Sequence, residues 1–169
     1  MIKILFDFVA SFIGLIVLMP ILIIISLINL IFQGFPLFFS HERLGKGGIP
    51  FTMIKFRTMT NEPSLSAEHD ITRLTHWGRF LRKTSIDELP VLFNVVKGEM
   101  SLVGPRPLPI KYYSRFNSFQ KKRMIVKPGI TGLAQIHGRN ELSWDDRFEY
   151  DIEYIKKQSF LFDIKIIFK

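Results

Sequence analysis

Two adjacent carboxylates, Asp87 and Glu88, have the types and spacing that best suit chemistry on a phosphate. They lie among basic residues in segment 82–90, and a carboxylate beside a bound phosphate can coordinate a metal ion or attack the phosphorus. The pair also has a structural interpretation, because Ser85 and Glu88 have the spacing of a capping box at the start of a helix. Taken alone, the segment favours capping. The two roles are compatible, because a carboxylate at a helix N-terminus stays ionised, as a nucleophile or a magnesium ligand must.

Arg106 is held between Pro105 and Pro107 and follows Gly104. Proline fixes the backbone and removes hydrogen-bond donors, so this loop is expected to be rigid and outside any sheet. Its arginine is either a solvated side chain on a structural turn or a guanidinium that grips a phosphate with two parallel hydrogen bonds. The loop alone slightly favours the structural turn.

Other candidate residues give weaker signals. Lys55 and Arg57 flank Phe56 in an extended segment, and such basic runs are most often solvated or lipid-facing surface. Gly138 and Arg139 belong to a stretch that can present backbone N–H groups to an oxyanion, although glycine more often marks a turn. The histidines lack metal-ligand spacing, and the absence of cysteine excludes disulfides and thiol catalysis.

The charge of this 169-residue chain is unevenly distributed. Residues 1–40 carry only Lys3 and Asp7, which cancel, so the net charge of +8 lies in residues 41–169. Such a cationic part favours anionic partners, namely nucleic acid, anionic lipid head groups or a phosphorylated metabolite. The length suits one domain with a real core.

Residues 8–32 form a nearly all-apolar stretch without a charge. At about 1.5 Å per residue, such a run can cross a hydrocarbon core of about 30 Å as a helix. Pro20 falls near its middle and predicts a kink or a break. Two geometries remain open: a kinked span, and a re-entrant helix-break-helix that returns to its starting face. The Lys and Arg residues that follow place the next part of the chain in the cytoplasm.

The elements that must position these side chains follow from periodicity and turn residues. A turn is expected at residues 45–50, an extended segment at 51–57 and a surface loop at 61–69. Helices are expected over residues 71–83, 87–96, 110–126 and 143–158. The tail, residues 160–169, fits a strand or an interfacial helix equally well.

Taken in order, several blocks of the sequence resemble the bacterial sugar transferase family, the monotopic phosphoglycosyl transferases that start glycan assembly on a polyprenyl carrier. The resemblance covers almost the whole chain, and its blocks are residues 35–39, 42–45, 50–59, 78–90, 92–98, 100–107 and 127–135. The chain departs from the pattern at His41 and Val91, where glutamine is frequent, and at Met19, where some members carry a serine before the proline.

The resemblance implies a mechanism for the acidic pair. In the family, the Asp of the pair attacks the β-phosphate of a UDP-sugar, releases UMP and holds the phosphosugar until polyprenyl phosphate takes it; here that residue is Asp87. Glu88 would assist deprotonation of the acceptor phosphate, Mg²⁺ touching Asp87 would neutralise the diphosphate, and Arg106 would hold a phosphate. Secondary substrate contacts are expected from Arg82, Lys55, Arg57 and Arg139.

The resemblance also implies an architecture and a location. Residues 1–34 are expected to form a re-entrant membrane anchor broken at Pro20, with both ends cytoplasmic. Residues 35–169 are expected to form a compact cytosolic catalytic domain, mainly α with short β segments (α+β), with interfacial amphipathic helices. The expected location is the cytoplasmic face of the bacterial inner membrane, and the expected partners are a UDP-sugar and polyprenyl (undecaprenyl) phosphate, with no nucleic acid. The alternative is a membrane-tethered, non-catalytic binder of nucleic acid or anionic lipid, which explains the charge but not the rigid proline loop beside an acidic pair.

Overall fold

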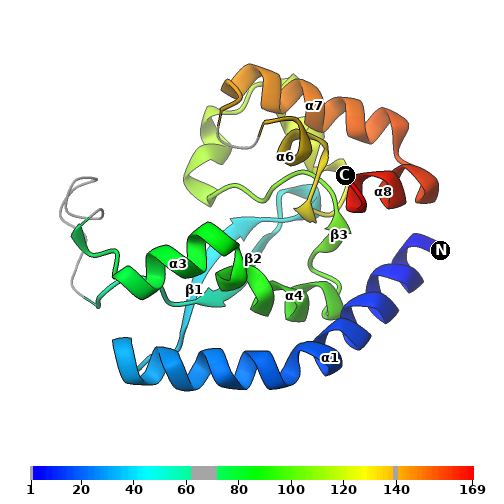
Figure 1. Cartoon of the computed structure of the whole chain (residues 1–169). Coiled ribbons are helices and arrows are strands. Elements are labelled where there is room, and N and C mark those ends of the chain that lie inside the picture. Colours follow the sequence, from blue (N-terminus) through cyan, green and yellow to red (C-terminus); the bar gives the residue numbers. More distant parts are fainter. Residues whose placement is uncertain (1, 62–71, 139–140) are drawn as a thin grey trace.

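The longest element is α1, a helix over Ile2–Gln33, in a computed structural model that describes residues 2–61, 72–138 and 141–169. The helix continues through Pro20, and its direction changes along its length (Figure 1). Proline removes one backbone donor and crowds the preceding turn, which a helix can accommodate by bending. The expected pair of half-helices separated by a break is therefore corrected to one bent helix.

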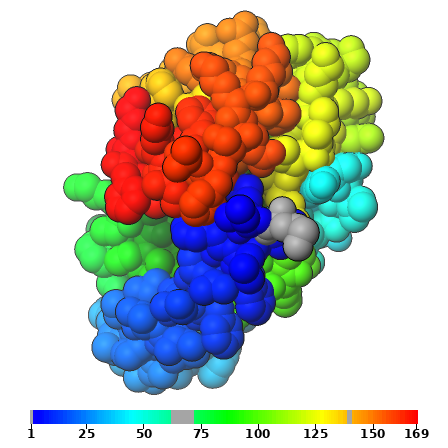
Figure 2. Space-filling view, turned by 90° about the vertical axis from the view of Figure 1, so that its right-hand side faces the viewer, coloured from blue at the N-terminus to red at the C-terminus, as the bar shows by residue number. Residues whose placement is uncertain are grey.

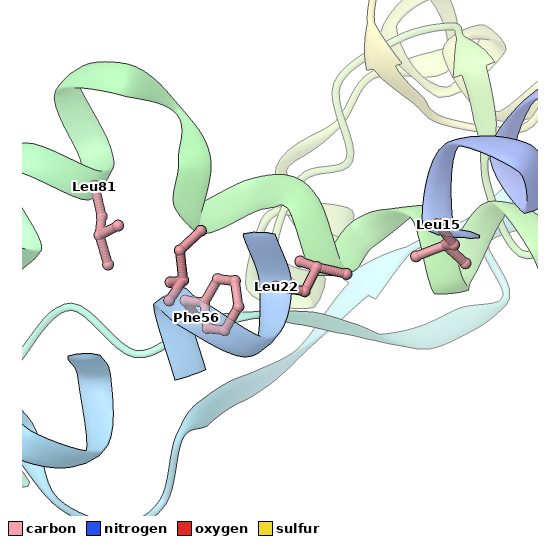
Figure 3. Close-up of a cluster of buried hydrophobic side chains, with 5 residues drawn as sticks. Leu15, Leu22, Phe56 and Leu81 are labelled. Atoms are coloured by element: carbon pink, nitrogen blue, oxygen red, sulfur yellow. The ribbon is translucent and has the colours of Figure 1, made fainter. Parts of the chain in front are cut away.

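One face of α1 packs on the rest of the protein. Its buried residues recur three, four or seven positions apart, which places them on one side of the helix: Asp7, Ser11, Leu15, Leu22, Ile25 and Asn29. Leu15 and Leu22 pack in one cluster with Phe56 and Leu81 (Figure 3). Burying such side chains contributes about 1.5–3 kcal/mol each. The outer face of α1 stays apolar and exposed, so the helix supplies both core and an apolar surface.

Strands β1 (Phe38–Leu44) and β2 (Pro50–Phe56) form an antiparallel ribbon. They are joined by the short 3-10 helix η1 (Lys46–Gly48), in which both Gly47 and Gly48 have positive φ angles that favour glycine. Phe51 and Met53 of β2 belong to a buried cluster with Val91 and Val95. The expected turn and extended segment are thus confirmed, and the ribbon is fixed to the segment that carries the acidic pair.

That segment consists of three short helices. Helix α3 (His76–Thr84) is followed by the 3-10 helix η2 (Ile86–Val91) and by α4 (Leu92–Val96). Thr75 is the N-cap of α3, and its side chain accepts a hydrogen bond from the Gly78 backbone N–H. The expected helix over residues 87–96 is present, although its first part is 3-10 and contains Pro90. Its end at Gly98, which has a φ of 80°, is confirmed.

Strands β3 (Ser101–Val103) and β4 (Gly129–Thr131) pair in parallel and enclose a connection made of short helices. The single basic helix expected over residues 110–126 is wrong. The structure has η3 (Ile110–Arg115), α5 (Ser118–Lys121) and η4 (Lys122–Ile125) in its place. The reason is local: Asn117 accepts a hydrogen bond from the Gln120 backbone in a capping box, which starts a new helix inside the basic run.

The C-terminal part is helical. Helices α6 (Leu133–His137), α7 (Trp144–Lys157) and α8 (Phe160–Ile167) follow β4, and Tyr154 of α7 is fully buried in a cluster with Val103, Leu133 and Ile166. The helix expected over residues 143–158 is confirmed, with Ser143 as its N-cap. The ambiguous tail is a helix. The whole is helix-rich with two small sheets, in agreement with the expected α+β class.

The N-terminal end of α1 is bonded to the C-terminal part of the protein. Lys3 Nζ lies 2.6 Å from Oδ2 of Asp163 in α8, and the other carboxylate oxygen of Asp163, Oδ1, accepts a 2.7 Å hydrogen bond from the Tyr154 hydroxyl. Asp7 accepts a 2.8 Å hydrogen bond from Ser101 Oγ. Figure 2 shows this end of α1 lying directly against α8. The contacts hold α1 and α8 together.

The other end of α1 is bonded to β2 and α3. Asn29 is fully buried, donates through Nδ2 to the Arg57 carbonyl at 3.1 Å and accepts at 2.8 Å from Trp77 Nε1. The Arg57 guanidinium in turn donates to the carbonyls of Gln33 and Gly34 at the end of the helix. Both ends of α1 are therefore attached to the same globular part.

Candidate active site

The acidic pair lies in η2, where a sharp turn separates it from α3. Ser85 has a φ of 58° and is the C-cap of α3, with its backbone N–H donating to the carbonyls of Arg82 and Leu81. Its side chain makes no capping hydrogen bond to η2. The expected capping box is therefore wrong, because Ser85 ends one helix in the left-handed conformation and the Glu88 carboxylate is held by side chains from elsewhere.

Glu88 is held by two cations from different parts of the chain. Lys55 Nζ from β2 lies 2.5 Å from Glu88 Oε1, and Arg106 Nη2 from the proline loop lies 2.8 Å from the same oxygen. The Lys55 and Glu88 side chains are 14% and 18% exposed, whereas Arg106 is 52% exposed. The inner cation is thus fixed in the protein, and the outer one reaches into solvent, where a substrate can meet it.

Asp87 is in a different state from its neighbour. It is 8% exposed, and its carboxylate forms no ion pair with any residue that the structure describes. Burial raises the pKa of Asp87 above its ordinary value, against the opposing charges of Lys55 and Arg82. Burial acts in the same direction on Glu88, but Arg106 and Lys55 outweigh it and hold the pKa of Glu88 below its ordinary value. One carboxylate is neutralised by cations, and the other keeps its oxygens free of an ion pair.

The loop that carries Arg106 is held in place by hydrogen bonds to its backbone from Arg123 and from the end of β1. Arg123 Nη2 donates to the Arg106 carbonyl at 2.7 Å, and the same guanidinium pairs with Asp151 of α7 at 2.7 Å. The Leu44 backbone N–H at the end of β1 donates to the Leu108 carbonyl at 2.9 Å. The expected rigid loop therefore owes its position to a buried ion pair as well as to its prolines. No local pattern around Arg123 predicted this role.

The remaining expected contacts separate into three cases. Arg82 is exposed, donates through Nε to Thr58 Oγ1 at 2.9 Å and contributes positive charge at Asp87. Arg57 is 5% exposed and is turned to the C-terminal carbonyls of α1, so the structure does not bring its side chain to the acidic pair. Arg139 lies outside the described residues. The structure therefore brings together Lys55, Asp87, Glu88 and Arg106, with Arg82 at the edge.

A family model with the description "Bacterial sugar transferase" matches residues 1–169 of the chain. The chain belongs to the bacterial sugar transferase family. This confirms the expected family and, with it, the expectation of a transferase enzyme.

Individual members of the family are similar at substantial identity. An "Uncharacterized sugar transferase EpsL" of Bacillus subtilis is 52% identical over 79% of this chain and 67% of its own length. An "Undecaprenyl-phosphate galactose phosphotransferase" of Salmonella typhimurium is 39% identical over 97% of this chain, and a "UDP-glucose:undecaprenyl-phosphate glucose-1-phosphate transferase" of Klebsiella pneumoniae is 41% identical over 96%. The chain spans little over a third of the length of these last two relatives, 38% and 37%.

The site of this sugar transferase contains two further residues that the sequence analysis did not select. His41 and Arg43 lie on β1, on the same face of the ribbon as Lys55, because residues two apart on a strand share a face and Phe39 pairs with Lys55. The signal available in the sequence was this alternation, combined with the register of the ribbon. Burial and the neighbouring cations Arg43 and Lys55 lower the pKa of His41 to about 4, so its ring is neutral.

The acidic pair also suits a divalent cation. No group of three or more His, Cys, Asp or Glu side chains gathers at one place in the described ranges, so the protein by itself does not form a complete cage. Mg²⁺ usually binds proteins through one or two carboxylates and completes its shell with water and substrate phosphates. Asp87, which forms no ion pair with a described residue, fits that role beside a bound diphosphate.

Proposed function

We propose that this protein transfers a sugar-1-phosphate from a UDP-sugar to polyprenyl phosphate and produces polyprenyl-diphospho-sugar and UMP. The names of the Salmonella and Klebsiella relatives describe this class of transfer. The single observation that carries the proposal is the difference in ion pairing between the two carboxylates of the acidic pair. Glu88 binds two cations, while the buried neighbouring Asp87 has no ion-pair partner in the described part of the chain. A carboxylate in that state is suited to nucleophilic attack.

In this mechanism a carboxylate oxygen of Asp87 attacks the β-phosphorus of the UDP-sugar. The bond between that phosphorus and the bridging oxygen breaks, UMP leaves with the electron pair, and the phosphosugar remains on Asp87. An oxygen of polyprenyl phosphate then attacks the same phosphorus, and the bond to Asp87 breaks. Lys55 and Arg106 lie where phosphate charge must be balanced, since both already bind a carboxylate oxygen there.

Glu88 has two successive tasks in the proposal. In the free protein it orients Lys55 and Arg106 through one oxygen. A bound phosphate competes with Glu88 for these two cations. When they turn to the phosphate, Glu88 loses their stabilising charge, and its pKa rises towards that of an ordinary or buried carboxylate. Glu88 then becomes able to take the proton from the acceptor phosphate. Mg²⁺ held by Asp87 and the diphosphate would supply further neutralisation of phosphate charge.

The proposed location is the cytoplasmic face of a bacterial inner membrane, with α1 re-entrant in one leaflet. Helix α1 is the one helix among the described residues that is long and apolar enough to cross a membrane. One fact favours insertion without crossing. The two ends of α1 are both bonded to the globular part, through Lys3 and Asp163 at one end and through Asn29 and Trp77 at the other. A helix that crossed would place these ends about 30 Å apart on opposite sides of the hydrocarbon core.

The direct test of the proposed function is UMP release from a panel of UDP-sugars by the full chain in detergent or nanodiscs, with Mg²⁺ and polyprenyl phosphate. We expect Asp87→Asn to abolish release, because the amide is not a nucleophile, and Glu88→Gln to slow release less. Asp87→Asn should keep the melting temperature of the wild type within a few degrees, whereas Glu88→Gln leaves the mostly buried Lys55 without its carboxylate and should lower it. Full turnover by Asp87→Asn excludes the covalent mechanism, and the absence of UMP release by the wild type with every UDP-sugar excludes the proposed function.

A further inference from the structure

The β1 face beside the acidic pair carries charge that the described residues do not balance. In the ribbon, Arg43 pairs with Phe51 and His41 with Met53, and Lys55 follows on the same face of β2. Phe51 and Met53 are buried against the segment that carries Asp87 and Glu88. His41 and Arg43 therefore face the side of the ribbon on which the site lies.

Arg43 is a half-buried guanidinium without an anionic partner in the described ranges. Its Nε is buried and makes no hydrogen bond with any described residue, and no carboxylate of the described residues lies within ion-pair distance of its side chain. Arg106 acts on Arg43 as a like charge, and the acidic groups that act on it are Glu88, which already binds two cations, and the Tyr112 hydroxyl. A half-buried cation beside a second cation is costly unless an anion joins them.

His41 adds to the unmet hydrogen bonding of this face. Both of its ring nitrogens are buried and have no hydrogen-bond partner among the described residues, and the ring stacks on Phe39 with centroids 5.2 Å apart. The neutral ring offers one donor and one acceptor without adding a third charge beside Arg43 and Arg106. Unpartnered buried polar groups gathered at one place are typical of a site that a ligand completes.

We propose that Arg43, with Arg106 and His41 beside it, forms a phosphate subsite that is used twice in one catalytic cycle. It receives first the phosphate of the departing nucleoside monophosphate and then the phosphate of the lipid acceptor. The inference rests on the proposed function for the order of these events, whereas the subsite itself rests on the unpaired Arg43 and the unpartnered ring nitrogens of His41.

The double use follows from the geometry of displacement at phosphorus. The attacking and leaving oxygens lie roughly in line, so the nucleotide leaves from the side opposite Asp87. The acceptor must displace Asp87 and therefore attacks from that same opposite side. Arg43 forms a β-bridge with Pro109, at the end of the loop that carries Arg106, so it lies on the Arg106 side of the pair, and we place the subsite there.

Two measurements on the full chain in nanodiscs test the subsite: the dissociation constant of UMP, and the KM for polyprenyl phosphate. We expect Arg43→Gln to weaken UMP binding about tenfold or more, the loss of a charge-assisted hydrogen bond, and to raise the KM for the acceptor by a similar factor. Arg43→Lys keeps the charge without the planar fork and should lie between Gln and the wild type. Arg79→Gln is the matched control, because Arg79 is an exposed arginine on the neighbouring helix α3, and it should change neither value.

The outcomes separate this inference from the proposed function. Wild-type UMP affinity or a wild-type acceptor KM in Arg43→Gln overturns the double use, even if the enzyme turns over as proposed. Equal losses in Arg43→Lys and Arg43→Gln, accompanied by lowered melting temperatures, overturn it too, because they assign Arg43 to the ribbon's stability. If the wild type releases no UMP, the proposed function fails while the UMP dissociation constants still decide the subsite. No UMP binding by the wild type overturns both.

Discussion

The pair between Lys55 and Glu88 gives a prediction in which burial decides the size of the effect. Replacing Lys55 by Met keeps most of the aliphatic stem and removes the ammonium, whose Nζ lies 2.5 Å from Glu88 Oε1 with the two side chains only 14% and 18% exposed. Arg106 still binds Glu88, so the lost interaction is one charge-assisted hydrogen bond of about 1.5–3 kcal/mol. For a chain of this size that corresponds to a melting temperature lower by about 3–12 °C.

The matched control is Lys157→Met. Lys157 pairs with Glu153 at 2.6 Å, nearly the same distance, but the two side chains are 61% and 42% exposed. Exposed helical pairs of this spacing contribute only about 0.3–0.5 kcal/mol, so its melting temperature should fall by about 2 °C or less. Differential scanning fluorimetry of both variants in one detergent measures the contrast.

The Lys55→Met variant also tests how neighbouring charges set the pKa of Asp87. Lys55 is the first of the opposite charges that hold down the raised pKa of Asp87. The ionised form of Asp87 is the reactive one, and removal of Lys55 raises its pKa further, so the acid limb of the pH–rate profile for UMP release should move to higher pH. Arg106→Met lacks this effect, because Arg106 acts on Glu88 and not on Asp87. A Lys55→Met protein that melts like Lys157→Met and keeps the wild-type acid limb refutes the reasoning.

Two further predictions concern the frame of the site. Because the chain has no cysteine, Ile2→Cys provides a single thiol at the start of α1. This thiol should react with an impermeant maleimide only from the cytoplasmic side, as should the thiol of the control variant Lys157→Cys. Labelling of Ile2→Cys from the opposite side would show that α1 spans the membrane. Asp151→Asn leaves the buried Arg123 guanidinium unpaired, which should cost about 3–5 kcal/mol and lower the melting temperature by about 6–20 °C. The double variant Asp151→Leu/Arg123→Met should melt well above Asp151→Asn in the same scan; if it melts no higher, the unpaired charge is not the cause.

Local patterns predicted those elements whose signals are local. The ribbon turn at Gly47 and Gly48, the helix that Ser143 caps and the end of the acidic segment at Gly98 all depend on backbone conformations that a few neighbouring residues determine. The basic run over residues 110–126 failed because a second local signal, the capping box at Asn117, was overlooked. The periodicity of the tail did not distinguish a strand from a helix. In the structure the tail is the helix α8, and its Phe160 ring packs against Phe6 near the start of α1.

The capping box at Ser85 shows the opposite case, in which a correct local pattern was overridden. The tetrapeptide has the required residue types, but Ser85 adopts the left-handed conformation that ends α3. Glu88 then interacts with Lys55, 33 residues away, and with Arg106, 18 residues away. Two charge-assisted hydrogen bonds in a partly buried site are stronger than one contact to a backbone N–H, so the long-range partners prevail.

The sequence by itself determined the apolar N-terminal stretch, the cationic remainder, the identity of the acidic pair and the family, because each depends only on which residues are present and in what order. Only the tertiary structure decided which cations serve that pair. Lys55 lies in β2 and Arg57 directly follows that strand, only two positions further on, yet Arg57 is turned to the end of α1 while Lys55 binds Glu88. The same folding left Arg43 without an ion-pair partner in the part of the chain that the structure describes. The physical reason is that a charge acts over a few ångströms in space, and chain order does not specify which residues lie within that distance.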